Sequence, residues 1–254
     1  MASATESRDR ALETQLAAHL KTRPVYAFRA IGSTMETAHQ LAAEGASEGT
    51  LVWAERQEQG RGRWGRTWES PPGGLYLSLI TRPARPAAET PQLSLVTGLA
   101  ITEAIQQMTT LFAAIRWPND LLLGGKKVCG ILLEARNGAA VIGIGLNVAT
   151  NPRELPETAT SLRAAGAACD AYQLPGALCA RFEQWYDAWT HQGFAPVREA
   201  LRPWMGLGQL VQIATPLEQL QGQAMDVDES GRLVVRLDSG IQRRFEAGEV
   251  TRLR

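Results

Sequence analysis

Apolar residues recur along the chain at two spacings, which predict helices and strands in turn. Helical spacing predicts amphipathic helices over residues 8–20 and 174–191, and a continuous apolar run predicts a buried helix over 93–108. Ser33, with Glu36 three residues later, matches a capping box that starts a helix running to Gly45. Short β-rich runs predict strands at 25–28, 51–54, 75–81, 115–117, 128–135 and 139–148. This order predicts an α+β protein.

One turn and a change of pattern refine this prediction. Asn137-Gly138 joins the last two of these strands and predicts a hairpin. After Trp204 the chain becomes a series of short alternating segments separated by glycines, at 209–213, 221–227, 233–237 and 242–246. We therefore predict a main domain over residues 1–206 and a small all-β barrel over 207–254.

Composition and charge exclude several classes of protein. With 44% hydrophobic and 20% charged residues, the chain has the composition of a globular protein. Its 26 Lys+Arg balance 26 Asp+Glu, so no protein-wide attraction to nucleic acid or anionic lipid is expected, and anion binding must be local. Cys129, Cys169 and Cys179 lack CxxC spacing, which predicts buried free thiols in a reducing compartment. With neither a signal peptide nor a membrane span in the pattern, we predict a cytoplasmic protein.

The densest chemical signal is a polar segment rich in arginine and glycine, residues 57–68, which we call the arginine–glycine loop. Glycine removes the Cβ obstacle and arginine binds carboxylate or phosphate bidentately, so Gly60-Arg61-Gly62-Arg63 and Gly65-Arg66 predict close approach to an anion. The flanking Trp68 adds a flat face for a heterocycle. A solvated flexible loop and a segment that stacks on single-stranded RNA are the alternatives. We predict a mobile loop that orders when ligand binds.

A second polar cluster follows the predicted strand 115–117. Pro118 ends this strand and places Asn119 and Asp120 at an exposed strand edge, where an aspartate can hold Mg²⁺ or accept a proton. Lys127 enters the next buried strand and would hold its ammonium near a phosphate or carboxylate. A turn with two solvated lysines is the alternative. A third segment, Gly143 to Asn147, contains only a lone GxG, which is weak evidence of phosphate binding.

Together the three segments resemble the biotin protein ligases, also called biotin–[acetyl-CoA-carboxylase] ligases. The resemblance covers residues 24–254 and rests on Gly32-Ser33-Thr34, Gln57, the GRGR run with Gly65-Arg66 and Trp68, Trp117-Pro118-Asn119-Asp120, Lys127 with Gly130-Ile131-Leu132, and Gly143 to Asn147. It implies a central mixed β-sheet flanked by helices and a C-terminal domain similar to an SH3 barrel.

The resemblance also implies a reaction. Biotin's carboxylate attacks the α-phosphorus of magnesium-bound ATP, giving biotinyl-5'-AMP and pyrophosphate, and a lysine of a biotin carboxyl carrier protein then takes the biotinyl group. The substrates are therefore biotin and ATP, and Mg²⁺ is the expected metal ion. The stretch before Pro24 is too short for a winged helix, so we expect no N-terminal DNA-binding domain. Both a monomer and a homodimer are compatible with the resemblance.

The resemblance implies these site residues. Catalytic roles fall to Lys127, Arg63 and Asp120, with Asp120 also a candidate Mg²⁺ ligand and a group that orients or deprotonates the acceptor lysine. Biotin is expected at Ser33, Thr34, Gln57, Gly60, Arg61, Arg63, Lys127 and Gly130. ATP or AMP is expected at Arg63, Arg66, Trp68, Asn119, Asp120, Lys127 and Asn147.

Three positions depart from the family pattern. Met35 stands where asparagine is more frequent, which removes a local hydrogen-bonding group near the helix start and leaves two roles for Ser33, a biotin contact and a helix cap. Trp64 interrupts the arginine run, and Arg116 replaces a more frequent lysine. Two rival functions remain: a lipoate or octanoyl transferase of similar fold, against which the arginine–glycine loop and WPND argue, and a module that stores biotinyl-adenylate or regulates transcription, against which the neutral charge argues.

Overall fold

A seven-stranded mixed sheet forms the centre of the computed structural model, which describes residues 7–20, 23–215 and 218–252. Its strand order is β1-β2-β3-β7-β6-β5-β4. The strands are β1 (Val25–Phe28), β2 (Leu51–Ala54), β3 (Gly74–Thr81), β4 (Ala114–Arg116), β5 (Asp120–Leu123), β6 (Lys126–Arg136) and β7 (Ala139–Asn147). β1 and β2 run parallel and every other neighbouring pair is antiparallel.

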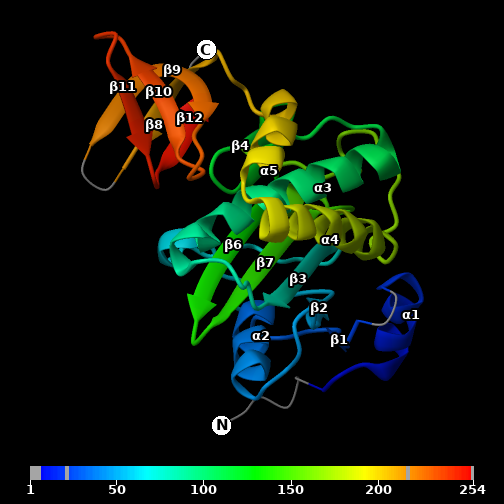
Figure 1. Cartoon of the computed structure of the whole chain (residues 1–254). Coiled ribbons are helices and arrows are strands. Elements are labelled where there is room, and N and C mark those ends of the chain that lie inside the picture. The colour runs from blue at the N-terminus through cyan, green and yellow to red at the C-terminus, as the bar shows by residue number, and fades with distance from the viewer. Residues whose placement is uncertain (1–6, 21–22, 216–217, 253–254) are drawn as a thin grey trace.

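Helices cover both faces of this sheet (Figure 1). On one face, α2 (Thr34–Ala43) packs on β2, β3 and β7. On the other face lie α1 (Arg10–Leu20), α3 (Leu93–Thr109), α4 (Leu174–Gln192) and the short α5 (Ala195–Leu201). Strand alternation explains the two layers: in β2, Val52 faces α2, whereas Trp53 faces the larger core.

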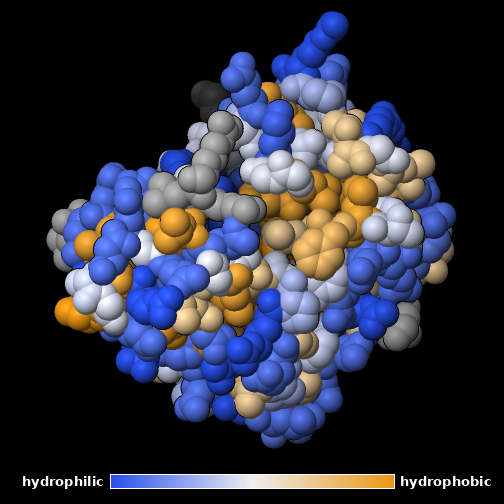
Figure 2. All heavy atoms as spheres, turned by 90° about the horizontal axis from the view of Figure 1, so that it is seen from above, coloured by the Kyte–Doolittle hydropathy of each residue, from blue (hydrophilic) through white to orange (hydrophobic). Residues whose placement is uncertain are grey.

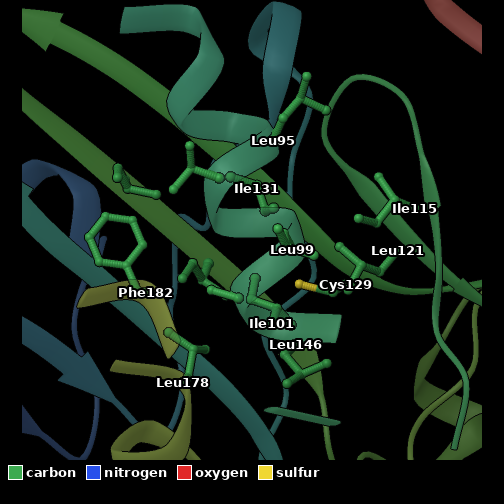
Figure 3. Packing of buried hydrophobic residues seen from close by; sticks show 14 of the residues in the cluster. Leu95, Leu99, Ile101, Ile115, Leu121, Cys129, Ile131, Leu146, Leu178 and Phe182 are labelled. Atoms are coloured by element: carbon green, nitrogen blue, oxygen red, sulfur yellow. The ribbon is translucent and has the colours of Figure 1, made fainter. Parts of the chain in front are cut away.

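The main hydrophobic core lies between β4 to β7 and the helices α3 and α4. Figure 3 shows Leu99 and Ile101 of α3 among side chains of the sheet, and Leu178 and Phe182 of α4 belong to the same cluster. α3 is apolar around most of its circumference, as expected of a helix enclosed by a sheet and a second helix. This packing gives the strands that bear the polar clusters a rigid support.

A second sheet lies beside the first, at the upper left of Figure 1. It contains β8 (Leu210–Ala214), β9 (Gln219–Val227), β10 (Leu233–Leu237), β11 (Gln242–Phe245) and β12 (Glu249–Arg252), in the antiparallel order β11-β10-β9-β8-β12. The Trp117 indole Nε1 donates a 3.0 Å hydrogen bond to the Gly231 carbonyl, which joins the two sheets. The predicted α+β fold class, with a central mixed sheet and a separate small β-sheet, is confirmed.

Local predictions fail at the turns more than in the long elements. The capping box is wrong: Ser33 makes no side-chain cap, and Glu36 points instead to Arg61. The prediction that Asn119 and Asp120 lie at an exposed strand edge is wrong. Asp120 starts β5, a strand that was not predicted and that pairs with both β4 and β6. α5 and β12 were also not predicted.

The predicted free thiols are confirmed, with Cys129 and Cys179 buried and Cys169 partly exposed. Within the described ranges, no helix is both long and apolar enough to cross a bilayer. Seen from above, the surface is largely hydrophilic with apolar side chains in separate areas (Figure 2).

Candidate active site

A cavity of about 380 Å³ lies on the α2 side of the central sheet. Its floor consists of Gly130 of β6 with Gly143 and Gly145 of β7, which we call the glycine floor. Because side chains alternate along a strand, these glycines face the cavity while Ile142 and Leu146 face the core. A methyl group at Gly145 would lie 2.5 Å from Nε1 of Trp68, so the indole needs a bare backbone there.

One end of the cavity is built from neutral polar groups. Oε1 of Gln57 accepts hydrogen bonds from the Thr34 amide at 2.9 Å and the Thr34 hydroxyl at 3.0 Å, so Gln57 caps α2 from another segment. Thr34 Oγ1 in turn accepts from Ser78 at 2.9 Å. The Ser33 hydroxyl is buried and has no hydrogen-bond partner within the described structure. Gln57 therefore caps α2 in place of Ser33, and the Ser33 hydroxyl is left as a buried polar group beside this end of the cavity.

The opposite end of the cavity is cationic. The Lys127 ammonium lies 2.7 Å from Oδ1 of Asp120, and Arg116 donates to Oδ2 of the same carboxylate at 2.5 Å. Arg63 donates to Oδ1 of Asn119 at 2.7 Å. Desolvation holds the pKa of the Arg63 guanidinium below its usual range, against the opposing pull of Asp120. A desolvated cation favours an anionic partner, so this end suits a carboxylate or phosphate.

Trp68 and Asn147 present polar atoms that lack a partner in the part of the chain that is described. The indole Nε1 of Trp68 and Oδ1 of Asn147 are buried and make no hydrogen bond, although the amide nitrogen of Asn147 donates to the Thr160 carbonyl at 3.0 Å. The Trp68 ring lies above the glycine floor, with the Lys127 ammonium 5.1 Å from its centre. Buried polar groups are normally paired, so both atoms indicate a ligand position.

Arg61 and Arg66 are both paired with carboxylates of the protein. Arg61 forms ion pairs with Glu36 and Glu134, and Arg66 forms one with Glu249 of β12. Glu249 was not identified from the sequence, because nothing in its neighbourhood distinguishes it from a surface residue.

The structure thus brings together most of the residues singled out from the sequence. Those that line the cavity are Thr34, Gln57, Arg61, Arg63, Arg66, Trp68, Asn119, Asp120, Lys127, Gly130 and Asn147. Ser33 and Gly60 lie just behind its wall, where Gly60 is packed against the Trp68 carbonyl and the Ser70 hydroxyl. Lining residues not predicted include Thr158, Ala159 and the stretch 248–251.

A metal site made by the protein alone does not fit this cavity. No group of three or more His, Cys, Asp or Glu side chains gathers anywhere in the described ranges. Both oxygens of Asp120 are paired with cations. Mg²⁺ usually binds through one or two carboxylates together with substrate phosphates, so the arrangement suits an ion brought in with a nucleotide.

Comparison with known proteins agrees with the geometry. Residues 27–151 match the Biotin/lipoate A/B protein ligase family, and residues 206–252 match the Biotin protein ligase C terminal domain. The bifunctional ligase/repressor BirA of Bacillus subtilis is 37% identical over 229 residues, covering 85% of this chain and 70% of that protein. The biotin–[acetyl-CoA-carboxylase] ligase of Paracoccus denitrificans is 34% identical over 218 residues, covering 79% of this chain and 89% of that protein.

A solved structure gives the same result. The biotin protein ligase from Aquifex aeolicus in complex with biotin and ATP superposes with a TM-score of 0.79 at 29% identity, covering 91% of this chain and 99% of that one. The family models, the curated relatives and the solved structure therefore all agree with the chemistry of the cavity. The chain belongs to the family of biotin protein ligases.

Proposed function

We propose that the protein is an ATP-dependent biotin protein ligase that acts in two steps. A carboxylate oxygen of biotin attacks the α-phosphorus of ATP, the bond to the β-phosphate oxygen breaks, and biotinyl-5'-AMP and pyrophosphate form. The ε-amine of a carrier-protein lysine then attacks the biotinyl carbonyl, AMP leaves and the amine loses a proton. The product is a biotin carboxyl carrier protein with biotin in amide linkage.

The observation that supports this most is the division of one cavity into a neutral polar end, a bare glycine floor and a cationic end. Biotin has the matching order: a ureido group, a flat apolar thioether ring with its tail, and a carboxylate. Ser33, Thr34 and Gln57 would bind the ureido group through hydroxyl and amide groups, beside Gly60. Gly130 and Gly145 let the Trp68 indole lie close to the strands, since no Cβ lies there, and the ring would pack against that indole.

Lys127 and Arg63 are the groups that we assign to the first step. A carboxylate approaching a triphosphate meets like charge, and two fixed cations at that end offset this repulsion and the charge that develops at phosphorus. The enzyme forms no covalent bond in this step. Mg²⁺, bound to the nucleotide phosphates, would add charge neutralisation, and Asp120, which lies beside Lys127, is the carboxylate that would hold it.

The nucleotide would occupy the wall formed by Trp68, Asn119 and Asn147, with Arg66 at the rim. The Trp68 ring supplies a stacking face for adenine, and the two asparagines supply amides for ribose or phosphate.

In the second step we assign Asp120 the role of orienting or deprotonating the acceptor lysine. The pairing of Asp120 with Lys127 supports this, because the same carboxylate can hold an incoming ammonium.

Each of the two sheets belongs to one proposed domain. We assign residues 1–206 to a catalytic domain and 207–254 to an SH3-like domain that closes one wall of the cavity through residues 248–251. The partner is the carrier protein of a biotin-dependent carboxylase, and the cytoplasm is the compartment in which both meet.

Biotin-dependent exchange of radioactive pyrophosphate into ATP tests the first step, and the mass of a purified carrier domain tests the second. We expect exchange with biotin, none with lipoate or octanoate, and a mass gain of one biotin on the carrier. Exchange driven by lipoate would instead identify the rival transferase. Tight adenylate binding without any transfer would identify a storage or regulatory module.

A further inference from the structure

The Arg61 guanidinium is held on two sides by carboxylates of the protein itself. Its NH1 group donates to Oε2 of Glu36 at 2.7 Å, and its NH2 group forms an ion pair with Oε1 of Glu134. Arg63, two residues later, instead contacts the neutral amide of Asn119. Arg61 is therefore already neutralised, whereas Arg63 forms no ion pair within the described residues and keeps its charge for a ligand.

The two carboxylates differ in how firmly they are fixed. The Glu36 side chain is 66% exposed, but that of Glu134 is only 19% exposed. Oε2 of Glu134 also contacts the buried His39 ring nitrogen at 2.9 Å and Arg136 at 2.8 Å. An exposed pair contributes little, whereas a shielded carboxylate with three donors holds its geometry. Glu134 is thus the fixed member of the pair.

Arg61 lies between a part of the arginine–glycine loop that is hydrogen-bonded to the domain and an exposed turn. Before it, the amides of Glu58 and Gln59 donate to the carbonyls of Ile31 and Gly32 at 2.9 and 2.8 Å. After it, residues 62–66 form a short turn closed by the Gly62 amide on the Arg66 carbonyl at 2.7 Å. Within that turn, the Trp64 side chain is 52% exposed. Arg61 therefore ties the loop to the body of the domain directly before this exposed turn.

We propose that Glu134 is a positioning residue: it holds Arg61 against β6, fixes the first part of the arginine–glycine loop, and so sets where Arg63 enters the cavity. Arg61 then acts as an anchor of the loop and does not contact the reacting anions. The catalytic consequence rests on the proposed ligase function, but the anchoring itself is a property of the ligand-free protein. The two can therefore fail separately.

A double-mutant cycle with Arg61→Gln and Glu134→Ala tests the catalytic consequence. If Glu134 acts through Arg61, both single variants should release biotinyl-AMP about tenfold faster, through misplacement of Arg63, and slow single-turnover adenylation less. The double variant should resemble either single one. Glu134→Gln, which keeps an oxygen for Arg61, should restore most of the retention. Glu36→Gln, on the same guanidinium but exposed, is the matched control and should stay within about twofold.

A direct contact between Arg61 and the anions gives the opposite pattern and would overturn the proposal. Arg61→Gln would then slow adenylation about a hundredfold. Glu134→Ala would free the guanidinium and leave adenylation unchanged or faster, and the two effects would add.

Hydrogen exchange of the ligand-free protein tests the anchoring without any activity. In Glu134→Ala, the amides of residues 58–62 should exchange faster than in the parent, while Glu36→Gln should match the parent. Arg61→Gln supplies the same readout should Glu134→Ala fail to fold, as judged by its melting curve. Unchanged exchange in the folded variants would refute the anchor, whatever reaction the enzyme catalyses.

Discussion

The ammonium of Lys127 lies 2.7 Å from Oδ1 of Asp120, across the adjacent strands β6 and β5. Lys127 pairs in register with Leu122, two residues after Asp120, so both charged side chains project from the same face of the sheet into the cavity. Asp120 therefore orients the ammonium, and an incoming carboxylate or phosphate can replace it as the partner.

Lys127→Ala should lower the rate of single-turnover adenylation by about a hundredfold, which corresponds to ~3 kcal/mol of lost charge stabilisation. Lys126→Ala is the matched control, because Lys126 is the exposed neighbour on the same strand and should leave the rate unchanged. Rapid-quench measurement of biotinyl-AMP distinguishes the two. Equal rates for Lys127→Ala and the parent would remove Lys127 from the first step.

Gly145→Ala should weaken biotin binding more than Gly143→Ala. The added methyl group at position 145 would lie 2.5 Å from Nε1 of the rigid Trp68 indole, whereas at position 143 it would meet the flexible Met35 thioether, with Sδ at 2.6 Å. The flexible methionine side chain can adopt another rotamer, but the rigid indole would have to move off the glycine floor. We expect losses of about tenfold or more for Gly145→Ala and less for Gly143→Ala, measured by calorimetric titration with biotin. The reverse order would contradict the glycine floor.

Elements with a strong local signal were predictable from the sequence. Asn137 and Gly138 both adopt positive φ, as the hairpin signal requires, and the apolar run over 93–108 is the buried helix α3. β5 escaped prediction because it has only four residues and follows directly on a cluster of turn formers. Because β5 lies between β6 and β4, Asp120 stands on an inner strand of the sheet and not at the predicted edge.

The site was predictable as a set of residues but not as a set of contacts. Gln57 caps α2 from 23 residues away, and Glu134 holds Arg61 from 73 residues away. No periodicity or local motif encodes such pairs, because they depend on how loop, helix and strand meet. Short-range rules therefore assigned the cap to Ser33, the nearest residue with the right chemistry.

Mild acid should destabilise the protein through His39. Burial, with Arg136 nearby, holds the pKa of His39 below its ordinary value of 6.5, although Glu134 and Glu36 oppose this. As the pH falls through 6.5, the unfolded chain takes up a proton that the folded protein excludes, so stability is full above this pH and is lost below it. Between pH 7.5 and 5.5, His39→Gln should lose about 2 °C less in Tm than the parent. Parallel losses in both proteins would exclude this role of His39.

The ion pair between Arg66 and Glu249 connects the arginine–glycine loop to the second sheet. Both side chains are about half exposed, so Glu249→Gln should change the free energy of unfolding by less than about 1 kcal/mol. Release of biotinyl-AMP should nevertheless become several-fold faster, because the loop loses its contact with β12. Glu246→Gln, which alters an exposed carboxylate just before β12, is the control. Identical release rates in all three proteins would show that the second sheet does not retain the adenylate.

Arg63→Gly should weaken retention of biotinyl-AMP more than it slows adenylation. Arg63 joins the loop to the catalytic strands through its hydrogen bond to Asn119, and a closed loop both binds the mixed anhydride and shields it from water. Adenylate that escapes is still an acyl donor, so this variant should biotinylate unrelated lysine-rich proteins that the parent ignores. Lys127→Ala, by contrast, should biotinylate nothing quickly. Adenylate off-rates and a streptavidin blot against a bystander protein test the contrast. Equal retention of the adenylate by parent and Arg63→Gly would show that Arg63 does not close the site.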